Sequence, residues 1–296
     1  MAYTNSDLLE QIKQRTMLPT NQNTWTDARL LALATEVARM HIVPLISQAR
    51  EGFFHYGSDD TLTSGRSIYP INARAVGQVL IDLELVQGDS VTSMGRIRPE
   101  EKGRGESRGR HRPVFYLKWN DIVLPDTSLS GTLRQTFLMQ HPDLIPVSSA
   151  GRITVIDTAT STVSVDVVPS GFTVNAVMDF IRGDGGHEYR GIDQTITGVS
   201  GLDVTFASLP DGLAVGDYLA LKGESPIAML PDEFQTVLIQ RCVVQINETG
   251  GYMEQRGAAM DTYREMVGHL MSVIQPRVKD EVKVAVSNMN NRGGYY

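Results

Sequence analysis

The sequence predicts an α+β protein in which a helical bundle, formed by both chain ends, carries an inserted β-rich module. Three observations support this fold class. Apolar residues recur with a helical period near each end of the chain. Short alternating runs, separated by Gly, Ser, Thr and Asp, fill the centre and are typical of strands and turns. The final segment is polar, basic and ends in glycines and tyrosines, which favours an extended C-terminal tail.

Four regions follow from these patterns. Residues 1–55 form the N-terminal part of the bundle and residues 56–225 the inserted β-rich module, a sandwich or barrel. Residues 226–276 supply the C-terminal helices, and residues 277–296 the extended tail. A length of 296 residues suits about two domains.

The N-terminal region predicts two helices. The first runs from about Ser6 to Arg15, with acids near its start and bases near its end. The segment 24–27 (Thr-Trp-Thr-Asp) resembles a capping box with Asp in place of Glu or Gln. The helix behind it runs to about Arg50 and is expected to kink at Pro44.

The central and C-terminal patterns are equally regular. Alternation predicts strands at Gly151–Asp157, Thr162–Val168, Thr195–Val199, Leu202–Phe206 and Tyr218–Leu221. A helix then begins near Leu230–Glu233 and weakens at Gly250-Gly251. A second apolar stripe, from Met260 to Ile274, predicts another helix that ends at Pro276.

Charge and composition exclude several classes of protein. No run of about 18 apolar residues occurs, so we expect no spanning helix and no membrane partner. No signal peptide is evident, and the single cysteine, Cys242, fits synthesis in a reducing cytoplasm. The net charge of −7 makes the whole chain a poor candidate for wrapping nucleic acid. Its distribution is uneven, because residues 113–274 carry nine bases and nineteen acids (9 − 19 = −10).

The familiar catalytic motifs are missing from the sequence. There is no Walker phosphate loop, no Gly-x-Ser-x-Gly elbow and no thiolate zinc set. We therefore expect no enzyme, no cofactor and no metal.

A few polar groups could still carry chemistry, although each has a simpler structural interpretation. The Gly-rich stretch 179–188 contains Asp179, Asp184, His187 and Glu188. These side chains could ligate a metal or support catalysis, but a solvated turn is the simpler interpretation. His41 could be an acid or base, but a packed interhelical histidine fits its helical face. Asp59-Asp60 could bind a metal or lie in a polar turn, and Cys242 is expected to be a small buried apolar group.

The most distinctive segment is a Gly-rich basic loop over residues 96–112, with seven bases and three acids (7 − 3 = +4). Its cations are Arg96, Arg98, Lys102, Arg104, Arg108, Arg110 and Arg112. Because no aromatic residue interleaves them, a base-stacking platform is not indicated. We expect contact with an acidic protein surface, such as a neighbouring copy; a solvated loop and phosphate contact with DNA are the alternatives.

The C-terminal tail is the second candidate contact segment. Its valines alternate with other residues, the period of a strand that could add to a partner's sheet edge, and two tyrosines could anchor in a pocket. The candidate contact residues are Arg277, Lys279, Val282, Val284, Val286, Arg292, Tyr295 and Tyr296. A frayed end without a role is the alternative.

The order of features resembles the head-to-tail adaptor (connector or neck) proteins of tailed bacteriophages. The resemblance extends over nearly the whole chain, but its motifs are structural rather than catalytic. They are residues 69–85, 95–101, 114–125, 213–219, 230–234, 271–279 and 290–292.

This resemblance implies a non-enzymatic virion protein at the neck between head and tail, assembled in the host cytoplasm. It implies a homo-oligomeric, dodecameric ring that binds the portal protein and the tail or nozzle proteins, and forms part of the channel through which viral DNA passes during ejection, without sequence specificity. The acidic body departs from a basic channel, although an acidic wall would let DNA slide without sticking. An alternative function is a tail or baseplate component whose β module binds a host-surface glycan.

Overall fold

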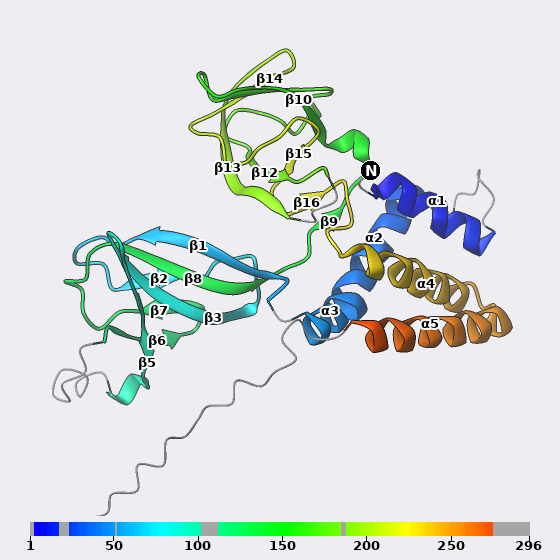
Figure 1. Ribbon diagram of the computed structural model, residues 1–296, viewed down its shortest axis with the longest axis horizontal. Coiled ribbons are helices and arrows are strands. Elements are labelled where there is room, and N and C mark those ends of the chain that lie inside the picture. The colour runs from blue at the N-terminus through cyan, green and yellow to red at the C-terminus, as the bar shows by residue number, and fades with distance from the viewer. Residues whose placement is uncertain (1–2, 18–23, 51, 102–111, 185–187, 275–296) are drawn as a thin grey trace, which may run out of the picture.

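The computed structural model describes residues 3–17, 24–50, 52–101, 112–184 and 188–274. These residues form a helical unit and two separate β units (Figure 1). Helices and strands contribute in comparable amounts, so the predicted α+β class is confirmed. Residues 56–225, for which we expected one sandwich or barrel, fold as two β units.

The helical unit combines both ends of the chain. Its helices are α1 (Asn5–Thr16), α2 (Asp27–Val37), the π-helical turn η1 (Ala38–Ile42), α3 (Val43–Ala49), α4 (Asp232–Thr249) and α5 (Met253–Val273). One apolar core joins them, because Leu8 and Leu30 from the N-terminal side and Phe234 and Leu238 from α4 are all fully buried in the same cluster. Helix α5 lies on the outside and buries Ala259 alone of its residues.

The capping box lies at the first helix and not at the second, where it was expected. Thr4 caps α1 with a capping box, since its hydroxyl accepts from the Asp7 amide and the Asp7 carboxylate accepts from the Thr4 amide. The box expected at residues 24–27 does not form. Thr26 is the N-cap of α2, and its hydroxyl accepts from the amide of Arg29.

Pro44 acts through a widened turn. A proline lacks the amide that its helix would use, and the π-helical turn η1 lies immediately before it, while Pro44 itself occupies the first turn of α3. The expected irregularity is therefore a π turn at Ala38–Ile42.

The combined helix Asp27–Ala49 corrects the expectation that no segment could span a membrane. Its 23 residues include an 18-residue stretch with a mean hydropathy of 1.4, which suffices for a span by length and composition. Half of that 18-residue stretch is buried inside the protein. The apolar residues are explained by packing, because Leu30, Ala34, Ala38 and Ile42 face the helical core.

The first β unit contains two sheets packed face to face. One sheet has the order β1-β8-β3-β4 and the other β2-β7-β6-β5. Their strands are β1 (His55–Thr61), β2 (Ile68–Pro70), β3 (Ala75–Gln87), β4 (Ser90–Ser93), β5 (Gly95–Arg96), β6 (Val114–Lys118), β7 (Asp121–Val123) and β8 (Thr132–Met139), with a 3-10 turn η2 at Pro99–Glu101. The shared core includes Leu83 and Phe137 from the first sheet and Tyr69 and Ile122 from the second.

The second β unit is a closed six-stranded barrel, ordered β10-β11-β14-β13-β12-β15. Its strands are β10 (Gly151–Asp157), β11 (Thr162–Val165), β12 (Val177–Ile181), β13 (Tyr189–Ser200), β14 (Asp203–Phe206) and β15 (Tyr218–Leu221). Closure leaves no free edge in the sheet. Phe180 and Phe206 fill the interior, with ring centroids 4.9 Å apart.

A short ladder ties the barrel to the helical unit. Strand β9 (Asp143–Leu144) enters the barrel and pairs in parallel with β16 (Glu224–Ser225), which leaves it. A 3-10 turn η4 (Val147–Ser149) follows β9. Leu144 is part of the helical core, and its amide donates to the Thr35 hydroxyl at 3.0 Å. The chain therefore returns to the helical unit between its two β units.

Candidate functional site

The described part of the basic loop lies at the end of the first β unit. Arg96 and Arg98 are exposed, and neither side chain has an ion-pair partner among the described residues. Arg112 is exposed but is attached to the sheet, since its guanidinium donates to the carbonyl and hydroxyl of Ser93. The remaining predicted cations lie outside the described residues: Lys102, Arg104, Arg108 and Arg110.

The predicted tail contacts cannot be placed. Arg277, Lys279, Val282, Val284, Val286, Arg292, Tyr295 and Tyr296 all lie outside the described residues. Pro276, expected to end the last helix, lies outside them as well, and the described chain stops at Ile274, directly after α5.

The acids considered for metal binding do not converge. Asp179 is fully buried in β12, whereas Asp184 and Glu188 both pair with the partly exposed Arg182, through Nη2 to Asp184 Oδ2 at 2.9 Å and Nη1 to Glu188 Oε2 at 3.5 Å. His187 lies outside the described residues. Within the described chain, no group of three or more His, Cys, Asp or Glu side chains could hold a metal ion.

The other single candidates are occupied by structural contacts. His41 lies between helices, with its Nε2 3.1 Å from Arg241 Nη2 of α4, and burial together with this cation lowers its pKa. Asp59 pairs with Arg134 at 3.0 Å, and Asp60 accepts from the Gln135 amide at 2.6 Å. Cys242 is fully buried, which raises the pKa of its thiol to about 12.

A buried ion pair joins the two β units. Arg74, between β2 and β3, donates through Nη2 to both carboxylate oxygens of Asp179 in the barrel, at 2.8 and 2.7 Å. The Asp179 oxygens also accept from the amides of Asp193 and Gly223. Burial raises the pKa of Asp179, while Arg74 and these amides oppose that rise. Two further guanidinium nitrogens of Arg74, Nε and Nη1, are buried without a hydrogen-bond partner among the described residues.

A fully buried histidine lies where the chain passes between the units. The His141 ring contacts two carbonyl oxygens, Nε2 to Ala228 at 2.7 Å and Nδ1 to Pro142 at 2.9 Å. The Arg39 guanidinium donates to the His141 carbonyl and pairs with Asp143. Burial lowers the pKa of His141 to about 4, and the two carbonyls, which both accept from a protonated ring, oppose that fall.

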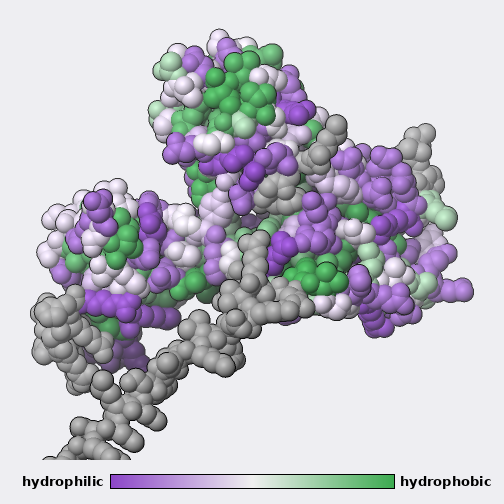
Figure 2. All heavy atoms as spheres, in the orientation of Figure 1, coloured by the Kyte–Doolittle hydropathy of each residue, from purple (hydrophilic) through white to green (hydrophobic). Residues whose placement is uncertain are grey.

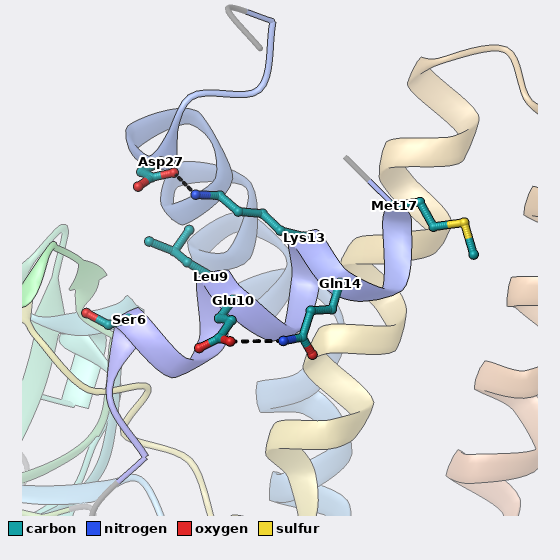
Figure 3. A pocket seen from close by; sticks show the side chains of 7 residues that line it. All are labelled: Ser6, Leu9, Glu10, Lys13, Gln14, Met17 and Asp27. Carbon is teal, nitrogen blue, oxygen red and sulfur yellow. Dashed lines mark hydrogen bonds and ion pairs between the residues drawn. The ribbon is translucent and has the colours of Figure 1, made fainter. Parts of the chain in front are cut away.

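Hollows of several hundred Å³ open on the described surface. One, of about 570 Å³, lies between α1 and the start of α2 (Figure 3). Its charged groups have partners within the hollow: Lys13 pairs with Asp27 at 2.5 Å, and Glu10 accepts from the side-chain amide of Gln14 at 2.9 Å. A second, of about 690 Å³ between the two β units, is lined by polar residues such as Asp59, and no aromatic side chain lines it. A third, about 290 Å³, is apolar.

One side chain projects strongly from the first β unit. Trp119, at the turn between β6 and β7, is 89% exposed. Its φ of 58° lies in the left-handed region, which is rare for a bulky residue. An exposed tryptophan held in such a turn is a candidate partner contact that the sequence patterns did not indicate.

Comparison with known proteins identifies no family for the chain. No protein-family model matches the chain, and a search of curated proteins finds no match.

Proposed function

We propose that the chain is a non-enzymatic virion structural protein: a head-to-tail adaptor that forms a homo-oligomeric ring between the portal of a phage head and the tail. The observation that carries the proposal is the helical unit, in which both ends of the chain share one core. Two β units project from it in different directions (Figure 1). Such a body offers different surfaces on its two sides, as a closed ring of head-to-tail contacts requires.

The charge distribution supports the same proposal. Residues 113–274 carry a charge of −10 (nine bases, nineteen acids), whereas Arg96 and Arg98 are exposed at the far end of the first β unit. Attraction between the basic loop of one copy and the acidic body of the next would favour association. At physiological salt this attraction acts over a Debye length of about 8 Å. The glycan-binding alternative is less well supported, since none of the described residues that line the hollow between the β units is aromatic.

Native mass spectrometry and cryo-electron microscopy of the protein, alone and mixed with the portal protein of the same virus, test this function. We expect a dodecameric ring seated on the portal. Virions that carry no copies, or one copy, at the neck would contradict the proposal. A protein that binds neither portal nor itself, but binds host glycans, would favour the alternative.

The basic loop has its own test. The double substitution Arg96→Ser with Arg98→Ser should leave the protein folded and weaken ring assembly. Because salt screens charge contacts, the difference in assembly between the unmodified protein and the variant should be largest at low salt. Lys118→Ser, an exposed cation on β6, is the matched control. Normal assembly of the double variant combined with failed DNA retention would instead support contact with DNA.

A further inference from the structure

The apolar hollow of about 290 Å³ lies where α3 meets the first β unit. We call it the α3–β3 groove, lined by Phe53, Phe54, Val76, Val79, Ile81 and Leu138. Its three β3 side chains are unusually exposed for apolar residues, 40% for Val76, 58% for Val79 and 44% for Ile81. Figure 2 shows apolar residues at the surface where the first β unit approaches the helices. Apolar groups gathered in a hollow mark a contact site more often than scattered ones do.

The described chain ends close to this groove. Ile274 packs against the same helical core as Phe53 and Phe54, and Figure 1 draws the end of α5 beside α3. Twenty-two residues follow Ile274 in the sequence. Val282 comes eight residues later, and an extended stretch of that length spans about 26 Å. The segment that follows α5 is therefore long enough to reach the groove of its own chain.

The chemistry of the two partners is complementary. Val282, Val284 and Val286 alternate with other residues, so an extended backbone would present all three on one side. Residues 275–296 carry four bases and two acids (4 − 2 = +2), whereas residues 56–95, which include β3, carry two bases and five acids (2 − 5 = −3). The exposed Asp82 of β3 directly follows Ile81 of the groove. Asp82 itself does not line the groove, so the match at this place is between apolar side chains, and the opposite net charges belong to the two stretches as a whole.

We propose that residues 282–286 of the chain's own C-terminal segment dock in the α3–β3 groove. The tether favours this occupant, because a short flexible connection gives an effective concentration in the millimolar range. Packing of the valines carries the contact rather than a new ladder, since the pairing of β3 with β8 shifts register between Ala75 and Asp82, with positive φ at Gly77 and Gln78. This goes beyond the proposed ring function: the groove covers the valines until a partner competes for them.

Disulfide trapping in the full-length protein tests the proposal. Val79→Cys combined with Val284→Cys should form a cross-link under mild oxidation, within a single chain. The native Cys242 is fully buried, so it does not compete. The control pair is Val155→Cys with Val284→Cys, because Val155 is 54% exposed on the outside of the barrel. We expect the groove pair to form about tenfold faster than the control pair.

Equal rates for the two pairs would overturn the proposal. Cross-links between two chains would also overturn it, because the groove would then hold the C-terminal segment of a second copy. A second measurement avoids dependence on the cysteine variants. Aspartates at Val282, Val284 and Val286 should increase deuterium uptake at β3 amides of the groove, whereas Ala285→Asp, on the opposite side of the extended segment, should not. Unchanged uptake in the triple variant would also overturn the proposal. Both measurements use isolated protein, so their failure is distinguishable from failure of the ring.

Discussion

The helical unit and the barrel reach stable cores by opposite routes. The helical core depends on residues more than 200 positions apart: the Asn5 side-chain amide donates to the Ser225 carbonyl at 2.8 Å, and Arg15 donates to Gln240 at 3.1 Å. The barrel closes entirely within residues 151–221. Loop closure over a long stretch costs more entropy and slows folding, so the barrel can form before the helical unit does. The helical unit is complete only once α5 (Met253–Val273) has been made.

The largest expected effect concerns the helical core. Leu238→Asp places an unpaired charge at a fully buried position of α4 and should lower the free energy of unfolding by several kcal/mol, roughly 4 or more. Leu270→Asp on the half-buried face of α5 is the matched control and should cost less. Hydrogen exchange should show lost protection in the helices with the barrel still protected. Equal loss in both units would show that they unfold as one.

The next effect tests how the barrel is joined to the first β unit. Arg74→Met leaves the Asp179 carboxylate buried without its counter-charge and should cost roughly 3–5 kcal/mol. Adding Asp179→Asn should recover part of this loss: the neutral amide needs no cation, but its NH2 group replaces one of the two oxygens that accept from the amides of Asp193 and Gly223. Urea unfolding of both single variants and the double variant measures the coupling. Additive costs would mean that the pair does not join the units.

Acid should loosen the junction by a smaller amount. The pKa of His141 is about 4 in the folded protein against 6.5 for an ordinary histidine. The folded value is depressed, so its contribution to stability is complete above pH 6.5 and is lost as the pH falls toward 4; the loss is on the order of 3 kcal/mol. Urea unfolding at pH 7 and pH 4.5 should show a smaller acid loss for His141→Gln. Parallel pH profiles for the two proteins would refute this role.

The smallest effect is expected at the barrel's periphery. Ala159 lies exposed in the turn between β10 and β11, where its amide donates to Asp157 at 3.0 Å. Ala159→Lys retains that bond and should change the free energy of unfolding by about 0.5 kcal/mol or less. Thermal melting compared with Leu238→Asp measures the contrast. Similar melting temperatures for the two variants would mean that Leu238 does not belong to the core.

Much of the fold follows from sequence periodicity. The predicted strands at Gly151–Asp157 and Tyr218–Leu221 coincide with β10 and β15, and the helical stripe of α4 is buried as expected. Strand β12 gives no alternating signal because four of its five residues are buried, including Asp179. The division into two β units also lacks a signal in the sequence. The ladder of β9 and β16, which separates them, contains only two residue pairs and is too short to give a periodic pattern.

The site was less accessible to prediction. A run of arginines predicts exposed side chains, because charged groups are rarely buried, and Arg96 and Arg98 are exposed. The Arg74–Asp179 pair joins residues 105 positions apart, and such a contact leaves no periodic pattern. The one available signal was an acid within the otherwise apolar run Val177–Ile181. The lowered pKa of His141 likewise depends on three-dimensional burial.

The two tryptophans divide the molecule for spectroscopy. Trp25 packs partly buried against the helical core, Trp119 stands almost fully exposed at its turn, and the barrel contains no tryptophan. Indole emission therefore reports on the helical unit and on one tip of the first β unit while remaining blind to the barrel. Any partner that covers the turn between β6 and β7 would move the Trp119 indole out of water, and a blue shift of its emission would mark where that partner binds.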